Sequence, residues 1–258
     1  MVTSGAVYVA GHGLIVSLTG DRRRPRSPIG LTVPGFAAAC VLAGSEVTIN
    51  GGVMKLGGLS VSVSRAPVWS ARRSTIDRCA AARLGDSISV AGANSLRAAS
   101  TRIGARLDAV VAASAGELRD AVQRLIGFGP GLTPSGDDAL AGLIVALSSS
   151  NSCELFRDQL VTAVLGNLHS TADISAQMLD LACHGLVNEA VDAVLVAGDC
   201  EAAVLRLLGV GATSGADTLL GIVAGLRLAV DQFVRGTSSY VAVGSLRCGT
   251  AGSRVSAK

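Results

Sequence analysis

The pattern of hydrophobic positions divides the chain into a strand-rich first part and a helical remainder. Short, β-branched apolar segments separated by Gly, Pro and Asn predict strands at 14–19, 38–42, 46–50 and 59–64 within residues 7–69. We expect them to form a small antiparallel sheet or barrel. From residues 70–75 onward, apolar residues recur at helical spacing, which predicts helices at 94–113, 117–126, 136–148, 153–167, 173–184, 187–196, 199–208 and 215–235. The fold class is therefore α+β.

Three regions follow from this pattern. They are a β-rich domain at 1–70, a helical domain at 71–235 and a Gly-, Ser- and Thr-rich tail at 236–258, which we expect to be flexible.

One motif occurs twice in the helical domain. Residues 129–147 are GPGLTPSGDDALAGLIVAL and residues 209–226 are GVGATSGADTLLGIVAGL. From Ser135 and Ser214 onward the copies align without a gap, 79 residues apart. The two following helices are apolar nearly all round, which is typical of central, buried helices. Gly142 and Gly221 stand at matching places in them and predict close helix–helix contact.

Each copy contains Ser-x-x-Asp before an apolar run, the pattern of a helix capping box. A third copy, Ser170 to Asp173, lies between them. Helix N-termini carry spare N–H donors and partial positive charge, so two or three that converge would form an anion site. Simple capping is the alternative interpretation for each copy.

Asp137 is the one acidic residue that the second copy lacks, since Ala216 takes its place. If Ser135 is the N-cap, Asp138 at the third helical position completes the cap and Asp137 points elsewhere. Asp137 then either interacts favourably with the helix dipole or acts as a metal ligand or hydrogen-bonding group in a cleft. The sequence leaves both interpretations open.

Composition excludes several function classes. A net charge of +3 is too weak to predict nucleic-acid binding, and we interpret the basic cluster at 22–26 as a solvated loop rather than a phosphate-binding arm. No apolar run reaches the length of a membrane span. No secretory signal opens the sequence, and six cysteines without zinc spacing predict buried free thiols. We therefore expect a cytoplasmic protein that contacts neither nucleic acid nor membrane.

The segment GPGLTPSGDD, the T-x-D-x-S segment of Thr171, Asp173 and Ser175, and the segment TSGADTLLG together resemble the AllH family. The resemblance covers most of residues 115–228 and is diffuse in the strand-rich part. It implies a subunit of an oxamate carbamoyltransferase in allantoin and purine-nitrogen breakdown, which moves a carbamoyl group between oxalurate and phosphate. It also implies an oligomeric assembly with an acyl-CoA-synthetase-like subunit and a second helical subunit.

With this resemblance, we expect the helix starts to bind oxalurate, oxamate, phosphate or carbamoyl phosphate. The candidate catalytic residues are Asp137 and Asp138, and Asp137 would bind Mg²⁺ or the carbamoyl NH₂. The candidate anion-binding residues are Gly131, Thr133, Ser135, Gly136, Thr171, Asp173, Ser175, Thr213, Ser214, Gly215 and Asp217.

Two alternatives remain open at this point. The chain could be a non-catalytic assembly subunit of the same complex, which would bind no ligand alone. It could also be a stand-alone metal-dependent hydrolase that uses Asp137 and Asp138, although adjacent carboxylates on one helix diverge.

Overall fold

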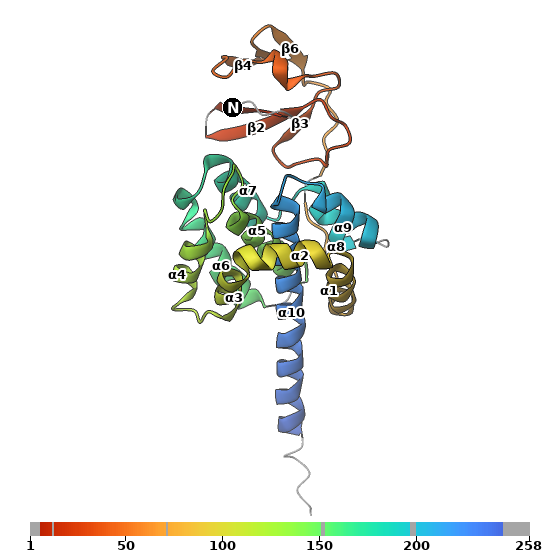
Figure 1. The fold of residues 1–258 in the computed structure, drawn as a ribbon, viewed down its shortest axis with the longest axis vertical. Coiled ribbons are helices and arrows are strands. Elements are labelled where there is room, and N and C mark those ends of the chain that lie inside the picture. The colour runs from red at the N-terminus through yellow and green to blue at the C-terminus, as the bar shows by residue number, and fades with distance from the viewer. Residues whose placement is uncertain (1–5, 12, 71, 151–152, 197–199, 245–258) are drawn as a thin grey trace, which may run out of the picture.

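The computed structural model describes residues 6–11, 13–70, 72–150, 153–196 and 200–244. A strand-rich region lies over one end of a helical body, and the last helix projects from the other end (Figure 1). The α+β class predicted from the sequence is confirmed.

The strand-rich region contains two three-stranded sheets rather than one antiparallel sheet or barrel. In the first, β1 (Val7–Gly11) pairs antiparallel with β2 (Leu14–Thr19), and β2 pairs parallel with β3 (Gly30–Thr32). The second is an antiparallel meander of β4 (Val47–Asn50), β5 (Val53–Leu56) and β6 (Leu59–Ser62). A small apolar core, centred on Leu18 and Met54, joins them.

The strand predicted at 38–42 is wrong, because this segment forms the short 3₁₀ helix η1 (Ala38–Cys40). The prediction that the cysteines are buried is also wrong where the structure describes them: Cys40 is exposed, and Cys153, Cys183 and Cys200 are only partly buried.

The helical body begins with α1 (Arg78–Ala91), which the sequence pattern did not predict, and α2 (Ala93–Ala99). A π-helical turn, η2 (Ser100–Gly104), then leads into α3 (Ala105–Ala112) and α4 (Leu118–Leu125). The remaining elements are α5 (Ser135–Ser149), α6 (Glu154–Leu165), η3 (Leu168–Ser170), α7 (Asp173–Cys183), α8 (Glu189–Val196), α9 (Cys200–Leu208) and α10 (Ser214–Gly244).

Helix α10 continues past the boundary predicted at 235. The rest of the predicted tail, residues 245–258, lies outside the described residues. Within the described part of the chain, no helix is long and apolar enough to cross a membrane.

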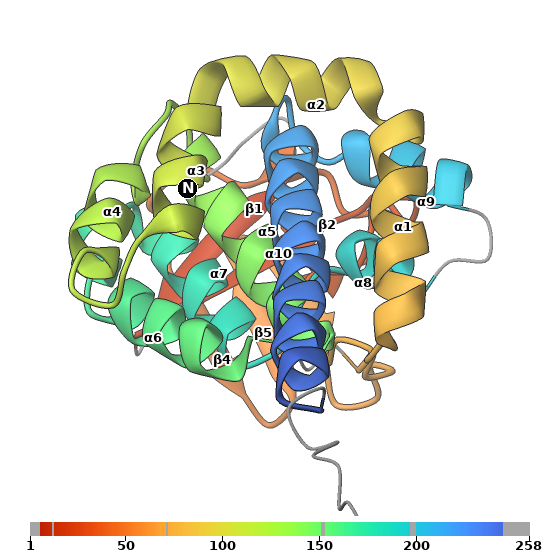
Figure 2. The ribbon, with the colours of Figure 1, turned by 90° about the horizontal axis from the view of Figure 1, so that it is seen from below.

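Helices α5 and α10 cross at the centre of the body, and the other helices surround them (Figure 2). Their contact is reciprocal at equivalent positions. A Cβ atom on Gly142 would overlap the Thr218 carbonyl, and a Cβ atom on Gly221 would overlap the carbonyl of Ala139, which aligns with Thr218. The close helix contact predicted at these glycines is therefore confirmed.

The predicted capping boxes are not present at α5 and α7. Helix α5 has Pro134 as its N-cap and α7 has Ala172, neither with a side-chain cap. Pro134 accepts the first backbone bonds, from the N–H groups of Asp137 and Asp138, so Ser135 is already helical. Helix α10 likewise begins at Ser214 itself. Asp138 is therefore one position beyond the place predicted for it and has no capping role.

Two polar contacts attach the first sheet to the helices. The side-chain amide of Gln177 on α7 accepts from the Ile15 N–H at 2.6 Å and donates to the Ile15 carbonyl at 2.9 Å. Arg26, in the loop between β2 and β3, pairs with Glu189 at the start of α8, with a guanidinium-to-carboxylate distance of 2.8 Å. These contacts place the sheet and its loop over the N-terminal ends of the central helices.

Candidate functional site

A cavity of about 580 Å³ lies between the first sheet and the glycine loops that precede α5 and α10. The sheet side supplies polar side chains from all three strands, among them Tyr8, Ser17 and Thr32. The helical side supplies Thr133, Asp138 and Ser214 at the helix starts. The cavity therefore combines one polar wall from each region of the fold.

The two glycine loops meet at this cavity, as the sequence argument for a shared site requires. The Thr133 and Ser214 hydroxyl groups, one from each loop, are 2.9 Å apart and hydrogen-bonded. Each loop is folded back on its own helix. The Gly136 N–H donates to the Phe128 carbonyl at 2.9 Å, and the equivalent Gly215 N–H donates to the Val210 carbonyl at 3.0 Å.

Asp138 lines the cavity and interacts with both hydroxyl groups, of Thr133 and Ser214. Its Oδ2 atom is buried and has no hydrogen-bond partner among the described residues. Burial raises the pKa of Asp138 to about 8, and the charges of Asp217 and Asp137 add to the rise, while hydrogen bonds with Ser214 and Thr133 oppose it. At neutral pH the carboxyl group is therefore mostly protonated.

Asp137, the other candidate catalytic residue, is buried and hydrogen-bonded at both oxygens. Oδ1 accepts from the Gly127 N–H at 2.7 Å, and Oδ2 accepts from the hydroxyl groups of Thr171 and Ser175, the latter at 2.6 Å. The T-x-D-x-S segment is thus brought to the first glycine loop through Asp137. This carboxylate connects three segments: the end of α4, the start of α5 and the start of α7.

Asp217, which aligns with Asp138, lies outside the cavity lining. It is fully buried and pairs with Arg102 of the π-helical turn at 2.7 Å. One turn later, Arg106 lies over the ring of Phe128 in the first glycine loop, 3.8 Å from its centroid. These contacts connect η2 to α10 and α3 to the first glycine loop.

The other predicted residues divide into two groups. Thr133, Ser175 and Ser214 line the cavity together with Asp137 and Asp138. Gly136 and Gly215 allow close approach to the Leu125 and Leu207 carbonyls, and Ser135 is buried. The residues that are outside the lining are Gly131, Ser135, Gly136, Thr171, Asp173, Thr213, Gly215 and Asp217.

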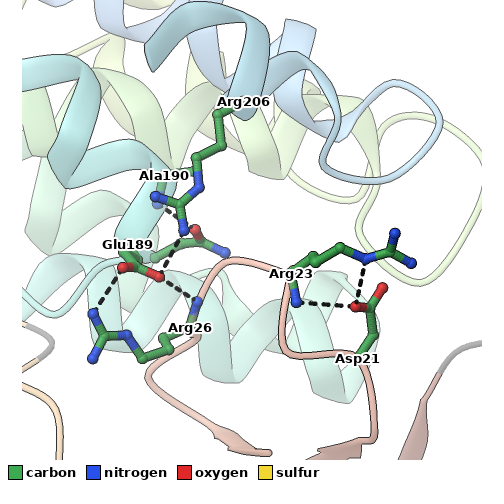
Figure 3. Close-up of polar contacts among 7 residues, drawn as sticks. Asp21, Arg23, Arg26, Glu189, Ala190 and Arg206 are labelled. Carbon is green, nitrogen blue, oxygen red and sulfur yellow. Dashed lines mark hydrogen bonds and ion pairs between the residues drawn. The ribbon is translucent and has the colours of Figure 1, made fainter. Parts of the chain in front are cut away.

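The sequence argument missed the basic cluster. Arg24 and Arg26, interpreted as part of a solvated loop, both line the cavity. Figure 3 shows how Glu189 holds this loop: its carboxylate binds the Arg26 guanidinium and backbone N–H, and also Arg206. Arg24 forms no ion pair with another described residue. A role for Arg24 in the cavity could be predicted only by combining two features, the run of arginines and a sheet that covers the helix starts.

No group of three or more His, Cys, Asp or Glu that could hold a metal ion occurs among the described residues. The Mg²⁺ role of Asp137 stays a prediction.

The architecture is an α+β protein with a polar cavity between a small sheet and two packed, glycine-preceded helices. Residues 125–226 match the model of the family described as oxamate carbamoyltransferase subunit AllH. The resemblance predicted from the sequence is confirmed over these residues. The match spans both glycine loops and the T-x-D-x-S segment, and it excludes the sheet that forms the opposite wall. No solved structure matches the chain.

Proposed function

We propose that this chain is the substrate-binding subunit of an oxamate carbamoyltransferase and that oxalurate or oxamate binds in the 580 Å³ cavity. The family description supports a subunit of this enzyme. The cavity volume is in the range of small-molecule sites, and its walls present few charged groups among many hydroxyl groups. Such a site suits a small molecule with one carboxylate and several amide groups.

The unpaired guanidinium of Arg24 would bind the substrate carboxylate, because its planar fork of donors matches two carboxylate oxygens. Thr133 and Ser214 would bind the carbamoyl oxygen or amide groups from the opposite wall. The protonated Asp138 adds a donor where an ionised carboxylate would repel the ligand. The charge of the site is thus suited to an anion without a cluster of lysines.

The carrying observation is the Oδ2 atom of Asp138, which is buried without a hydrogen-bond partner among the described residues, on a side chain that lines the cavity. A pKa near the working pH suits a general acid. In the proposed step, a phosphate oxygen attacks the ureido carbonyl carbon of oxalurate, and the bond from that carbon to the oxamate nitrogen breaks. Asp138 gives its proton to the leaving nitrogen and regains one from the attacking hydrogen phosphate. The products are oxamate and carbamoyl phosphate.

The word "subunit" in the family description supports further chains in the assembly. We propose that partner subunits, of the acyl-CoA-synthetase-like and helical kinds, complete the enzyme in the cytoplasm. A purely structural role in that assembly is the competing proposal, since the chain would then bind its partners and no substrate.

A ligand panel distinguishes these proposals. Thermal unfolding of the full chain is measured with oxalurate, oxamate, oxalate, phosphate and carbamoyl phosphate, with and without Mg²⁺. We expect oxalurate or oxamate to raise the melting temperature by a few degrees at saturating concentration, and Arg24→Gln to remove the effect. Arg119→Gln, an exposed arginine on α4 away from the cavity, is the matched control. A flat panel with intact partner binding would favour the structural role.

A further inference from the structure

A second cavity, of about 380 Å³, lies at the C-terminal ends of α5 and α7. Its walls come from the segment before α1, from α6, and from the C-terminal ends of α5 and α7. Asp137 and Ser175 stand at the first turns of α5 and α7, whereas Ser148 and Cys183 stand at their last turns. The two linings share no residue, but they adjoin at the end of α7, where Ala182 and Leu186 line the substrate cavity and Cys183 and Gly185 line the second.

Positive charge dominates this second cavity. Arg72, Arg73 and Arg157 line it, against the single carboxylate of Asp158. Arg157 pairs with Asp158 at 2.9 Å, which leaves Arg72 and Arg73 without an ion-pair partner among the described residues. Three guanidinium groups and one carboxylate give an excess of two positive charges, which matches a dianion.

Arg73 has an unsatisfied hydrogen-bond donor in this cavity. Its Nε atom is buried with no hydrogen-bond partner, and a buried donor left unpaired is unfavourable. The side chain lies beside Gly185, which follows α7 with a φ of 76°. Burial and the neighbouring Arg157 lower the pKa of Arg73, so an anion between the two guanidinium groups would relieve both effects.

Nothing in this cavity favours covalent chemistry. Burial, with the charge of Asp180 in addition, raises the pKa of the Cys183 thiol to about 12, so it is not a thiolate nucleophile at neutral pH. His184 contacts Asp180 on its own helix, with its Nδ1 atom 2.8 Å from the Asp180 carbonyl. The cavity is suited to binding alone.

We propose that Arg72, Arg73 and Arg157 form a second anion site, separate from the substrate cavity, which binds a phosphate group. Paired guanidinium groups around a concave polar pocket suit the tetrahedral dianion better than a flat protein surface would. The site would be held by the two helices that carry Asp137 and Ser175 at their other ends.

The test is isothermal titration of the full chain with inorganic phosphate. Arg24→Gln serves as the background, so that the arginine proposed to bind an anion in the substrate cavity does not contribute. We expect this variant to bind one phosphate, and the addition of Arg72→Gln and Arg157→Gln to weaken that binding at least tenfold. Arg119→Gln in the same background is the control and should leave the affinity unchanged.

The alternative is that these arginines only stabilise the C-terminal ends of α5 and α7, where positive charge is favourable. The charge-deleted variants would then melt at a lower temperature with unchanged phosphate affinity, and this result would overturn the proposal. If the combined variant does not fold, Arg72→Gln alone, an exposed side chain, gives the same test. Because the site shares no residue with the substrate cavity, its failure and the failure of the proposed function are separate results.

Discussion

Asp138 and Asp217 occupy equivalent positions in the two repeat units, but only Asp217 has an arginine partner. Arg102 binds Oδ1 of Asp217 at 2.7 Å, whereas Asp138 has no arginine partner among the described residues and lines the cavity; the Oδ2 atom of each is buried without a hydrogen-bond partner. The second unit therefore carries a neutralised, structural aspartate. The first carries an aspartate at the cavity lining whose pKa burial raises to about 8.

Arg102→Gln should destabilise the fold by about 2 kcal/mol, because it leaves the Asp217 charge buried without its partner. The full penalty for a buried pair is not expected, since the Arg102 side chain is 36% exposed. Urea unfolding of the ligand-free chain measures this. Combining Arg102→Gln with Asp217→Asn should restore part of the loss, and additive losses in the double variant would contradict the pairing account.

Gly142→Ala and Gly221→Ala should each destabilise the fold by about 3 kcal/mol, since the new Cβ atom forces α5 and α10 apart. Gly116→Ala is the control, because open space surrounds that position. Unfolding free energies that are equal for all three variants would show that the two helices are not held together at these glycines.

Asp137→Asn should lower the stability of the ligand-free and metal-free chain by about 2 kcal/mol, because it weakens the hydrogen bonds from Gly127, Thr171 and Ser175. The exposed Asp173→Asn, at the start of α7, is the control. Chemical unfolding in the presence of a chelator makes the comparison. If Asp137 acts only as a ligand to substrate or metal, the two variants will have the same stability under these conditions.

The Arg26–Glu189 contact predicts a specific acid dependence. The hydrogen bond from Arg26 is the main cause that lowers the pKa of Glu189 to about 2, from an ordinary value of 4.5. A carboxyl group with a lowered folded-state pKa stabilises the fold fully above its unfolded pKa and loses this contribution as pH falls. Stability should therefore decline between about pH 4.5 and pH 2, and Glu189→Gln should reduce that decline.

The control for this experiment is Glu201→Gln, an exposed carboxylate on α9. Unfolding free energies are compared across this pH range in wild type and both variants. An acid dependence that is the same in Glu189→Gln and Glu201→Gln would show that the contact does not attach the loop to α8.

The sequence predicted the central part of this site because the signal was local. Two glycine loops before apolar helices, with Gly142 and Gly221 at matching places, were sufficient to predict two buried helices in close contact. The meeting of Thr133 and Ser214 also agrees with the expectation that the helix starts converge.

The remainder depended on contacts that no local pattern encodes. Arg102 lies 115 residues from Asp217 in the sequence. The ion pair that distinguishes Asp217 from Asp138 therefore depends on the tertiary structure. Pro134 takes the N-cap position expected for Ser135 and shifts Asp138 out of the cap. Arg24 reaches the cavity only because Gln177 and Glu189 hold the sheet region on the helices.

The most direct test of the central claim is the pH dependence of oxalurate binding, measured by titration calorimetry in wild type and in Asp138→Asn. With a pKa of about 8 for Asp138, loss of its proton should weaken wild-type binding about tenfold between pH 7 and pH 9. Asp138→Asn, which is neutral at both values, should bind with little change. If wild-type affinity is equal at the two pH values, or if Asp138→Asn folds but binds nothing at either, the protonated Asp138 is not the group that receives the ligand.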